Sequence, residues 1–325
     1  HHGIGFTGYS TGTIACTNGT ISNNLIYANI RGLNLFWHNG VGSTMNVFGN
    51  TISIMNPASG NVIWGILHQS YNGTTNFYNN RVQAMTQKTT GTQGIYAFGT
   101  LNGIASSITN IYNNFFGGGF DHTGSGVPAS MDVVSFQDNP ASAVVRLYYN
   151  TIVYNDFTKN ATTRMTCIRF NPVAGGTFDI KNNILVNNKD NSLSFVYHFG
   201  ASSATFTSNY NNAYSTGLNA NIGYFSTARK TLANWQSASS QDANSKSKAV
   251  TFTSATDLHL SGASNGDTDL IGTPIALVTT DIDGEARNAT YPYMGADEAA
   301  TPLPVELSSL NAAVSGTSVT LKWTT

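Results

Sequence analysis

Acidic side chains are distributed unevenly along this chain, and their first occurrence limits where chemistry can take place. No Asp or Glu precedes Asp121 in the 325 residues, so the earlier part of the chain has neither paired carboxylates nor acidic metal ligands. Residues 117–171 are different, because acids and bases occur there together. The candidates among them are Asp121, His122, Asp132, Asp138, Asp156, Lys159, Arg164 and Arg169. If the chain has a catalytic or binding site, we expect it in this segment.

Two reactions on polysaccharides use these residue types. In a lyase, Lys159 or Arg164 would remove the proton beside a uronate carboxylate, and His122 would assist. Calcium would be held by carboxylates of the same segment, for which the candidates are Asp132, Asp138 and Asp156. In a hydrolase, two of those aspartates would act as acid and base. No spacing here matches a specific catalytic motif, and such side chains more often belong to solvated loops, so we favour a binding role over catalysis.

Two further sets of polar residues complete the candidates. As binding residues the sequence offers Asp121, Arg169, Asn171 and His198. The motif Asp281-Ile282-Asp283-Gly284-Glu285 imitates part of a calcium loop, and its candidate metal ligands are Asp281, Asp283 and Glu285. It lacks the later bidentate Glu of an EF-hand, and a tight Asp-Gly turn explains the motif better. Calcium is therefore a candidate cofactor without a defined site.

A recurring asparagine predicts the scaffold that positions these residues. It returns in a similar apolar frame every 26 to 36 residues, at Asn24, Asn50, Asn80, Asn114, Asn150, Asn183 and Asn209. A period of this length is typical of solenoids. Asparagine tolerates the left-handed backbone of a sharp corner, and its amide can bond the equivalent amide of the next coil. We expect these side chains to form a stacked ladder that belongs to the scaffold.

Short strands precede and follow each asparagine corner, as in Val62 to Leu67 and Cys167 to Phe170. Two or three such strands per repeat, with coils about 4.8 Å apart, predict an all-β fold, a right-handed parallel β-helix. A β-propeller is the alternative, but its blades need four strands in about 40 to 50 residues. Repeat length varies mainly after the corner, most strongly after Asn114 and Asn150. Those insertions should stand side by side and form the wall of a groove beside residues 117–171.

Composition excludes several partners. Hydrophobic residues make up 40% of the chain, charged residues 10%, and the formal net charge is −1. Nucleic acid and anionic membranes are therefore not expected as partners. No apolar run approaches the roughly 20 residues of a membrane span. Cys16 and Cys167 lie about five coils apart, so we expect free, buried thiols rather than a disulfide.

The repeats stop near residue 225, and the sequence predicts three segments. Residues 1–225 form the β-helix coils, residues 226–301 form closing coils and a cap, and residues 302–325 form the first strands of a truncated β-sandwich. A short helical signal lies in Ser226 to Ser237, with Thr231 as its candidate cap. We expect Trp235 of this segment to plug the open end of the stack.

The closing phrases of the chain carry a family resemblance. Five phrases are similar to the closing coils of secreted β-helix proteins of Bacteroidota, some of them related to polysaccharide lyases. These phrases are NWQSAS, QDANSKS, TDLHLSG, TDIDGEAR and MGADE. The segment PLPVELSSLNAAVSGTSVTLKWTT resembles the opening of the β-sandwich domain that precedes the sorting signal in type IX secretion cargo. The resemblance covers residues 232–325 well and the repeats only generically.

This resemblance implies export by the type IX secretion machinery, to the medium or to the outer-membrane surface of a Gram-negative bacterium. With the acid-free first coils, it favours a β-helix module that contacts glycans or acts as an adhesin. The alternative is a polysaccharide lyase or glycoside hydrolase with its groove beside residues 117–171. A polysaccharide ligand is expected in both cases.

Overall fold

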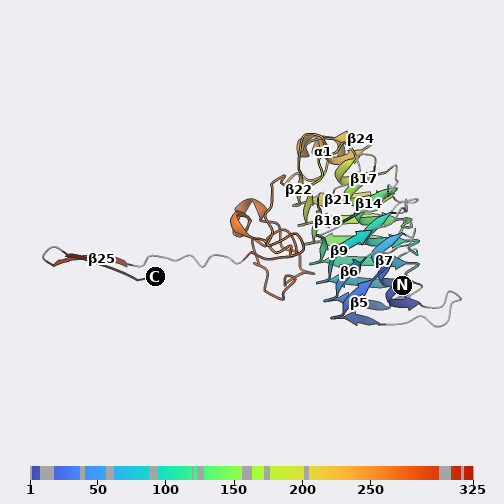
Figure 1. Cartoon of the computed structure of the whole chain (residues 1–325), viewed down its shortest axis with the longest axis horizontal. Coiled ribbons are helices and arrows are strands. Elements are labelled where there is room, and N and C mark those ends of the chain that lie inside the picture. The colour runs from blue at the N-terminus through green and yellow to red at the C-terminus, as the bar shows by residue number, and fades with distance from the viewer. Residues whose placement is uncertain are drawn as a thin grey trace.

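The computed structural model confirms the predicted fold class, a parallel β-solenoid in an all-β chain (Figure 1). It describes residues 2–7, 18–36, 41–55, 62–87, 94–104, 106–118, 121–122, 128–155, 163–171, 176–200, 205–299, 309–315 and 318–324. Successive coils contribute one strand to each of three sheets, which we call sheets A, B and C, and neighbouring strands within a sheet run parallel.

Sheet A carries the longest strands of the solenoid. In spatial order its strands are β1 (His2–Thr7), β4 (Arg31–Phe36), β7 (Ile63–Gln69), β10 (Ile95–Leu101), β14 (Ser130–Gln137), β17 (Arg164–Asn171), β20 (Ser194–Phe199), β23 (Asn221–Phe225) and β24 (Thr227–Arg229). Only the last pair, β23 and β24, is antiparallel among the described strands of this sheet. That reversal marks the end of the coils.

Sheets B and C flank the asparagine corner. Sheet B consists of β2 (Thr20–Ser22), β5 (Thr44–Phe48), β8 (Thr74–Tyr78), β11 (Ile108–Tyr112), β15 (Val144–Tyr148), β18 (Thr177–Lys181) and β21 (Thr205–Asn209). Sheet C consists of β3 (Leu25–Ala28), β6 (Thr51–Met55), β9 (Arg81–Gln87), β12 (Phe115–Gly117), β16 (Thr151–Tyr154), β19 (Ile184–Asn187) and β22 (Asn212–Ser215), with β13 (Asp121–His122) beside β9.

Alternating side chains fill the interior of the coils. In β8, Thr75 and Phe77 are buried, whereas their neighbours in the strand are partly exposed, as expected for a strand with one face on the core. Phe136 and Phe170 stack at 5.4 Å between ring centroids, so the core is continuous from coil to coil. Cys167 is buried and free, as predicted; Cys16 lies outside the described residues.

The buried asparagine ladder is present, with one change of membership. Each member donates from Nδ2 to Oδ1 of the member in the next coil, at 2.8 to 3.1 Å. The last member is Asn211 rather than the predicted Asn209, because Asn183 bonds Asn211. The left-handed residue is also not the ladder asparagine but the one before it, for example Asn79 with φ 54°. The ladder asparagine is thus free to direct its side chain inward.

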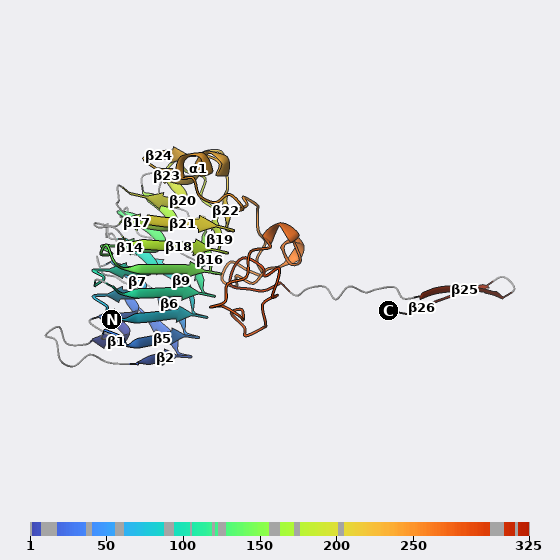
Figure 2. The ribbon, with the colours of Figure 1, turned by 180° about the vertical axis from the view of Figure 1, so that it is seen from behind.

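The solenoid ends in the predicted helical cap. Helix α1 (Leu232–Ser239) begins after Thr231, whose side chain accepts from the backbone N–H of Asn234. Trp235 is fully buried and stacks on Tyr197 with 4.8 Å between ring centroids. Its indole N–H donates to Asp242 at 2.7 Å. Figure 2 shows α1 beyond the last strands at one end of the stack.

Residues 246–299, which we call the lobe, depart from the expected closing coils. They contain two short 3-10 turns, η1 (Gly262–Ser264) and η2 (Thr268–Leu270), and pack against the outer face of sheet C rather than across the end of the stack (Figures 1 and 2). Phe115, Val153 and Ile184 of sheet C share an apolar cluster with lobe residues. The lobe thus returns beside coils formed much earlier in the chain.

After the lobe, β25 (Ser309–Ser315) and β26 (Ser318–Thr324) form an antiparallel hairpin with its own sheet. This is consistent with the two strands predicted for this segment, and the described part ends there. No described helix is long and apolar enough to cross a membrane.

Candidate functional site

The outer face of sheet A brings together several of the predicted site residues. Asp132 of β14 pairs in register with Thr166 of β17, and Arg169 of β17 pairs with His198 of β20. Asp132 points outward, between the inward-facing, buried Met131 and Val133. We call the following set the sheet A patch: Asp132, Arg164, Thr166, Arg169, His198 and Tyr224.

Asp132 is the centre of this patch and is completely covered by its partners. Arg164 binds it through Nε at 3.3 Å and through an NH2 group at 3.0 Å, and Thr166 donates its hydroxyl at 2.7 Å. Arg169 places a guanidinium nitrogen 3.7 Å from the same carboxylate. The two arginine side chains remain 22% and 18% exposed, whereas Asp132 is 0% exposed. Two accessible positive charges therefore face solvent over one buried negative charge.

The electrostatics of the patch keep Arg164 charged. Burial alone would lower the pKa of Arg164, but the adjacent carboxylate of Asp132 outweighs it and raises that pKa. A carboxylate that accepts from Arg164 and from one hydroxyl, with a guanidinium nitrogen of Arg169 at 3.7 Å, has few acceptor positions left for a substrate. The surplus positive charge is instead available to an anionic ligand.

His198 adds a neutral aromatic surface to the patch. Its ring stacks on Tyr224 at 4.7 Å between centroids and meets Phe195 edge-on at 5.4 Å. Burial, with smaller contributions from Arg164 and Arg169 and against an opposing effect of Asp132, lowers the pKa of His198 to about 4. At neutral pH the imidazole is uncharged.

We expect an NMR titration to give His198 a pKa near 4. Between the usual value of 6.5 and pH 4, the unfolded chain takes up a proton that the folded chain does not, so folding stability falls on acidification through this window. The variant His198→Gln should lose less stability there than the wild type in urea unfolding at each pH. A measured pKa of 6 or higher would contradict this environment.

Two aromatic side chains beside the patch are largely enclosed. Trp64 and Tyr96 stack at 4.2 Å between ring centroids and are only 5% and 7% exposed. They pack with Leu67 in a small apolar cluster on the outer face of sheet A. The hydroxyl of Tyr96 bonds that of Ser130 at 2.7 Å, next to the patch. These rings support the patch rather than form an open platform for sugars.

The other predicted residues lie in different places. Asn171 ends β17 and pairs with Gln137, so it borders the patch. Asp138 follows β14 in a left-handed turn, with φ 53°. Asp121 and His122 form β13 and pair with β9 in sheet C, a different sheet from the patch. Asp156 and Lys159 lie outside the described residues.

Strand register places two histidines of sheet A, His68 and His198, on opposite faces of the sheet. His68 pairs with Thr100 and Leu35; it is fully buried and stacks on Tyr71 at 3.6 Å. His198 pairs with Arg169 instead and lies one position away from that inward column. A shift of one residue along a strand moves a side chain to the opposite face.

A second polar cluster lies in the lobe and includes one of the predicted calcium ligands. Asp283 contacts Nε2 of His259 at 2.7 Å and a guanidinium nitrogen of Arg81 at 2.7 Å. Asp281 is fully buried and accepts the backbone N–H groups of Asp283 and Glu285 at 2.9 and 2.8 Å. The geometry thus places Asp281 in the tight turn, whereas Asp283 points to the histidine.

Sequence reasoning missed three members of this lobe cluster: Asp257, His259 and Asp297. His259 Nδ1 bonds Asp257, and a carboxylate oxygen of Asp297 lies within 4.8 Å of ligand atoms of His259 and Asp283. The signal was present in three phrases, because TDLHLSG contains Asp257 and His259, TDIDGEAR contains Asp283 and MGADE contains Asp297. Their convergence depends on the fold of the lobe.

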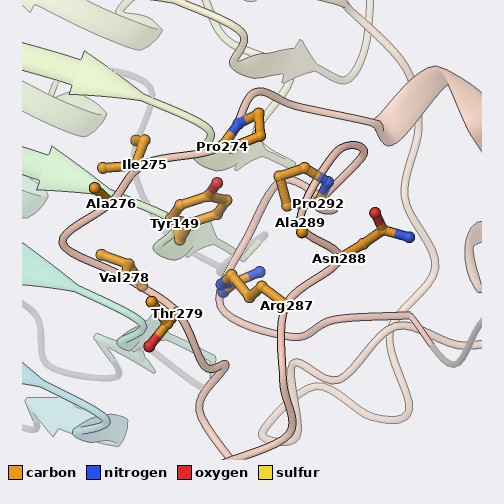
Figure 3. Close-up of a pocket in the computed structure, with 10 residues that line it drawn as sticks. All are labelled: Tyr149, Pro274, Ile275, Ala276, Val278, Thr279, Arg287, Asn288, Ala289 and Pro292. Atoms are coloured by element: carbon orange, nitrogen blue, oxygen red, sulfur yellow. The ribbon is translucent and has the colours of Figure 1, made fainter.

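Figure 3 shows an apolar cavity of about 470 Å³ between the lobe and the asparagine corner. Pro274, Ile275 and Val278 form part of its wall. The guanidinium of Arg287 lies 4.0 Å from the ring centroid of Tyr149. Arg287 is tied to Glu298 at 3.0 Å and to Asn113 at 2.8 Å, so it joins the lobe to the solenoid.

Comparison with known proteins gives no family for the chain. No family model matches it, and searches of curated proteins and of solved structures find no match. The functional argument therefore depends on the residues of the sheet A patch and of the lobe cluster.

Proposed function

We propose that this chain is a secreted or cell-surface β-helix module that contacts an anionic glycan through the sheet A patch. The observation that supports this most strongly is the pair of arginines on one buried carboxylate. Asp132 neutralises one of the two guanidinium charges and fixes both side chains on a flat sheet face. A uronate carboxylate fits the charge that remains.

The surroundings of the arginines favour a sugar over a compact anion. The His198 and Tyr224 rings stack beside Arg169 and are partly exposed, which gives a sugar ring an apolar surface to lie against. Asn171 and Gln137 continue the polar surface along the end of the same strands. Because the β-strands repeat along the stack, an extended polymer could follow them from coil to coil.

The variant Arg169→Gln should weaken binding of galacturonate oligomers at least about tenfold, since hydrogen bonds between two charged groups contribute roughly 1.5 to 3 kcal/mol. Arg169 is the better choice than Arg164, because Arg164 still covers Asp132 when Arg169 is removed. Titration calorimetry with oligomers of defined length gives the dissociation constants.

Arg146→Gln is the matched control for that titration. Arg146 also projects from a solenoid strand, but it belongs to sheet B and bonds Asn110 at 3.1 Å. Its removal should change the affinity by less than about twofold. Equal losses in both variants would indicate attraction by overall charge and would contradict a defined binding patch.

A polysaccharide lyase or glycoside hydrolase is the second candidate function. One observation favours it: basic groups of Arg164 and Arg169 lie within 4 Å of an aspartate, as a groove with acid and base would require. A screen on uronate and neutral polysaccharides, with and without calcium, tests it. Double-bond absorbance that disappears in Arg164→Ala or Lys159→Ala would replace the binding proposal by a lyase.

Export through the type IX machinery is a proposal that depends on the closing phrases and the terminal hairpin segment alone. Antibody detection in fractionated source cells tests it. The chain should be found in the medium or at the outer-membrane surface, and its confinement to the cytoplasm would contradict export.

A further inference from the structure

Three loops of the lobe bring metal-ligand side chains to one point. His259, Asp283 and Asp297 each offer one ligand atom, and these atoms all lie within 4.8 Å of one another. The three residues belong to separate turns of the lobe, 24 and 14 residues apart in sequence. The three residues are separate from the sheet A patch, because the lobe packs against sheet C.

Backbone hydrogen bonds hold the three loops in place. The N–H of Leu260 donates to Asp297 at 2.7 Å, which connects the histidine loop to the last acidic loop. The N–H of Ile282 donates to the carbonyl of Ala296 at 2.9 Å, and that of Glu298 donates to Asp281 at 3.1 Å. Sites fixed by such supporting bonds lose little entropy when they bind an ion.

The ring of His259 has the kind of carboxylate partner that metal-bound histidines use. Its Nδ1 bonds Asp257, which fixes the ring orientation and directs Nε2 toward Asp283. A carboxylate on the distal ring nitrogen is the common arrangement behind a ligating imidazole. Arg81 takes one oxygen of Asp283 at 2.7 Å and leaves the other oxygen facing Nε2.

We propose that His259, Asp283 and Asp297 bind a divalent transition-metal ion, with Asp257 as the residue that positions the histidine. One imidazole and two carboxylates favour Zn²⁺ or a similar ion over Ca²⁺, which prefers oxygen ligands alone. In a tetrahedral zinc site with bonds of about 2.0 Å, ligand atoms lie about 3.3 Å apart. Ligand atoms within 4.8 Å therefore need to move by only about an ångström or two.

The ion would cross-link three loops of the lobe at the place where the lobe contacts the solenoid. Asp283 is bonded to Arg81 of β9, and His259 meets Phe115 of β12 edge-on at 4.9 Å. A metal that binds only the folded arrangement stabilises it by a free energy that grows with the logarithm of the ratio of metal concentration to dissociation constant. The site would therefore stabilise the fold of the lobe next to its contact with sheet C.

Zinc binding is measured by competition with a chromophoric chelator, using the full chain in a background of His1→Asn and His2→Asn, because those adjacent histidines can capture zinc themselves. We expect one Zn²⁺ per chain and a thermal midpoint that rises by about 3 °C or more in excess Zn²⁺. His259→Gln and Asp283→Asn should each lower the affinity at least about tenfold.

Asp269→Asn is the control, because Asp269 is an exposed lobe acid paired with Lys248 at 3.0 Å and remote from the three ligands in the bonding network. It should leave zinc affinity unchanged. Absence of zinc binding by the parent chain, or equal affinity in His259→Gln, overturns the site. A thermal shift with Ca²⁺ and none with Zn²⁺ overturns the assignment to a transition metal.

Discussion

Asn114→Ala should lower the free energy of unfolding by about 3 to 5 kcal/mol, because it removes the middle of the buried amide ladder. Asn114 is 0% exposed, and its Nδ2 donates to the carbonyls of Phe77 and Tyr112 and to Oδ1 of Asn150, each at 2.9 Å. Its Oδ1 accepts from the backbone and side-chain nitrogens of Asn80 at 2.9 and 3.0 Å. Alanine leaves several of these groups buried without a partner.

Asn46→Ala provides the matched comparison. Asn46 belongs to an outward-facing amide row, is partly exposed, and accepts one hydrogen bond from Asn76 at 2.9 Å. Water replaces that bond, so its loss should cost no more than about 1 kcal/mol. Urea unfolding with unchanged m-values gives both numbers. Similar losses in the two variants would show that the inner ladder does not support the coils in the way its geometry indicates.

Trp235→Ala should cost about 3 to 5 kcal/mol, because it removes the side chain that closes the C-terminal end of the solenoid core. Trp235 is fully buried, stacks on Tyr197 and lies 6.4 Å from Phe199 between ring centroids. The truncation also exposes the end of the stack, where unpaired strands promote association. We therefore expect a lower thermal midpoint together with increased light scattering at high protein concentration.

Trp235→Phe separates packing from hydrogen bonding at the cap. The phenyl ring retains most of the stacking area but loses the indole N–H that donates to Asp242 at 2.7 Å. It should cost about 1 to 3 kcal/mol and should not increase scattering. If alanine and phenylalanine variants unfold and scatter alike, the ring does not act as the plug.

The solenoid could be predicted from the sequence because its determinants are local and repeated. Asparagine with flanking alternating strands recurs in every coil, and that pattern fixes both the ladder and the inward face. The last repeat, FTSNYNN, contains three asparagines, and sequence alone selected Asn209 instead of Asn211. The choice depends on strand register and on Asp242, which accepts from Asn211 Nδ2 at 3.2 Å.

The lobe could not be predicted in the same way, because its contacts connect distant parts of the chain. Arg81 and Asp283 are 202 residues apart, and Asn113 and Arg287 are 174 apart. No sequence period relates the two residues of either pair. The sequence therefore predicts closing coils for TDLHLSG, TDIDGEAR and MGADE, and it does not connect His259 with Asp283.

The candidate site in sheet A was predicted in part. Coil spacing placed Asp132 and Arg164 close together, and the structure brings them within hydrogen-bond distance. The sequence did not indicate that the carboxylate of Asp132 would be buried beneath two arginines, because burial depends on which way each side chain points across the sheet. This arrangement supports the recognition of an anion.

A crystal structure of the chain with a galacturonate oligomer tests the central claim most directly. We predict a sugar carboxylate about 2.7 to 2.9 Å from guanidinium nitrogens of Arg169, with a sugar ring against the His198 and Tyr224 pair. Oligomer bound elsewhere, or an unchanged sheet A patch at a concentration that saturates binding in solution, would contradict the proposed function.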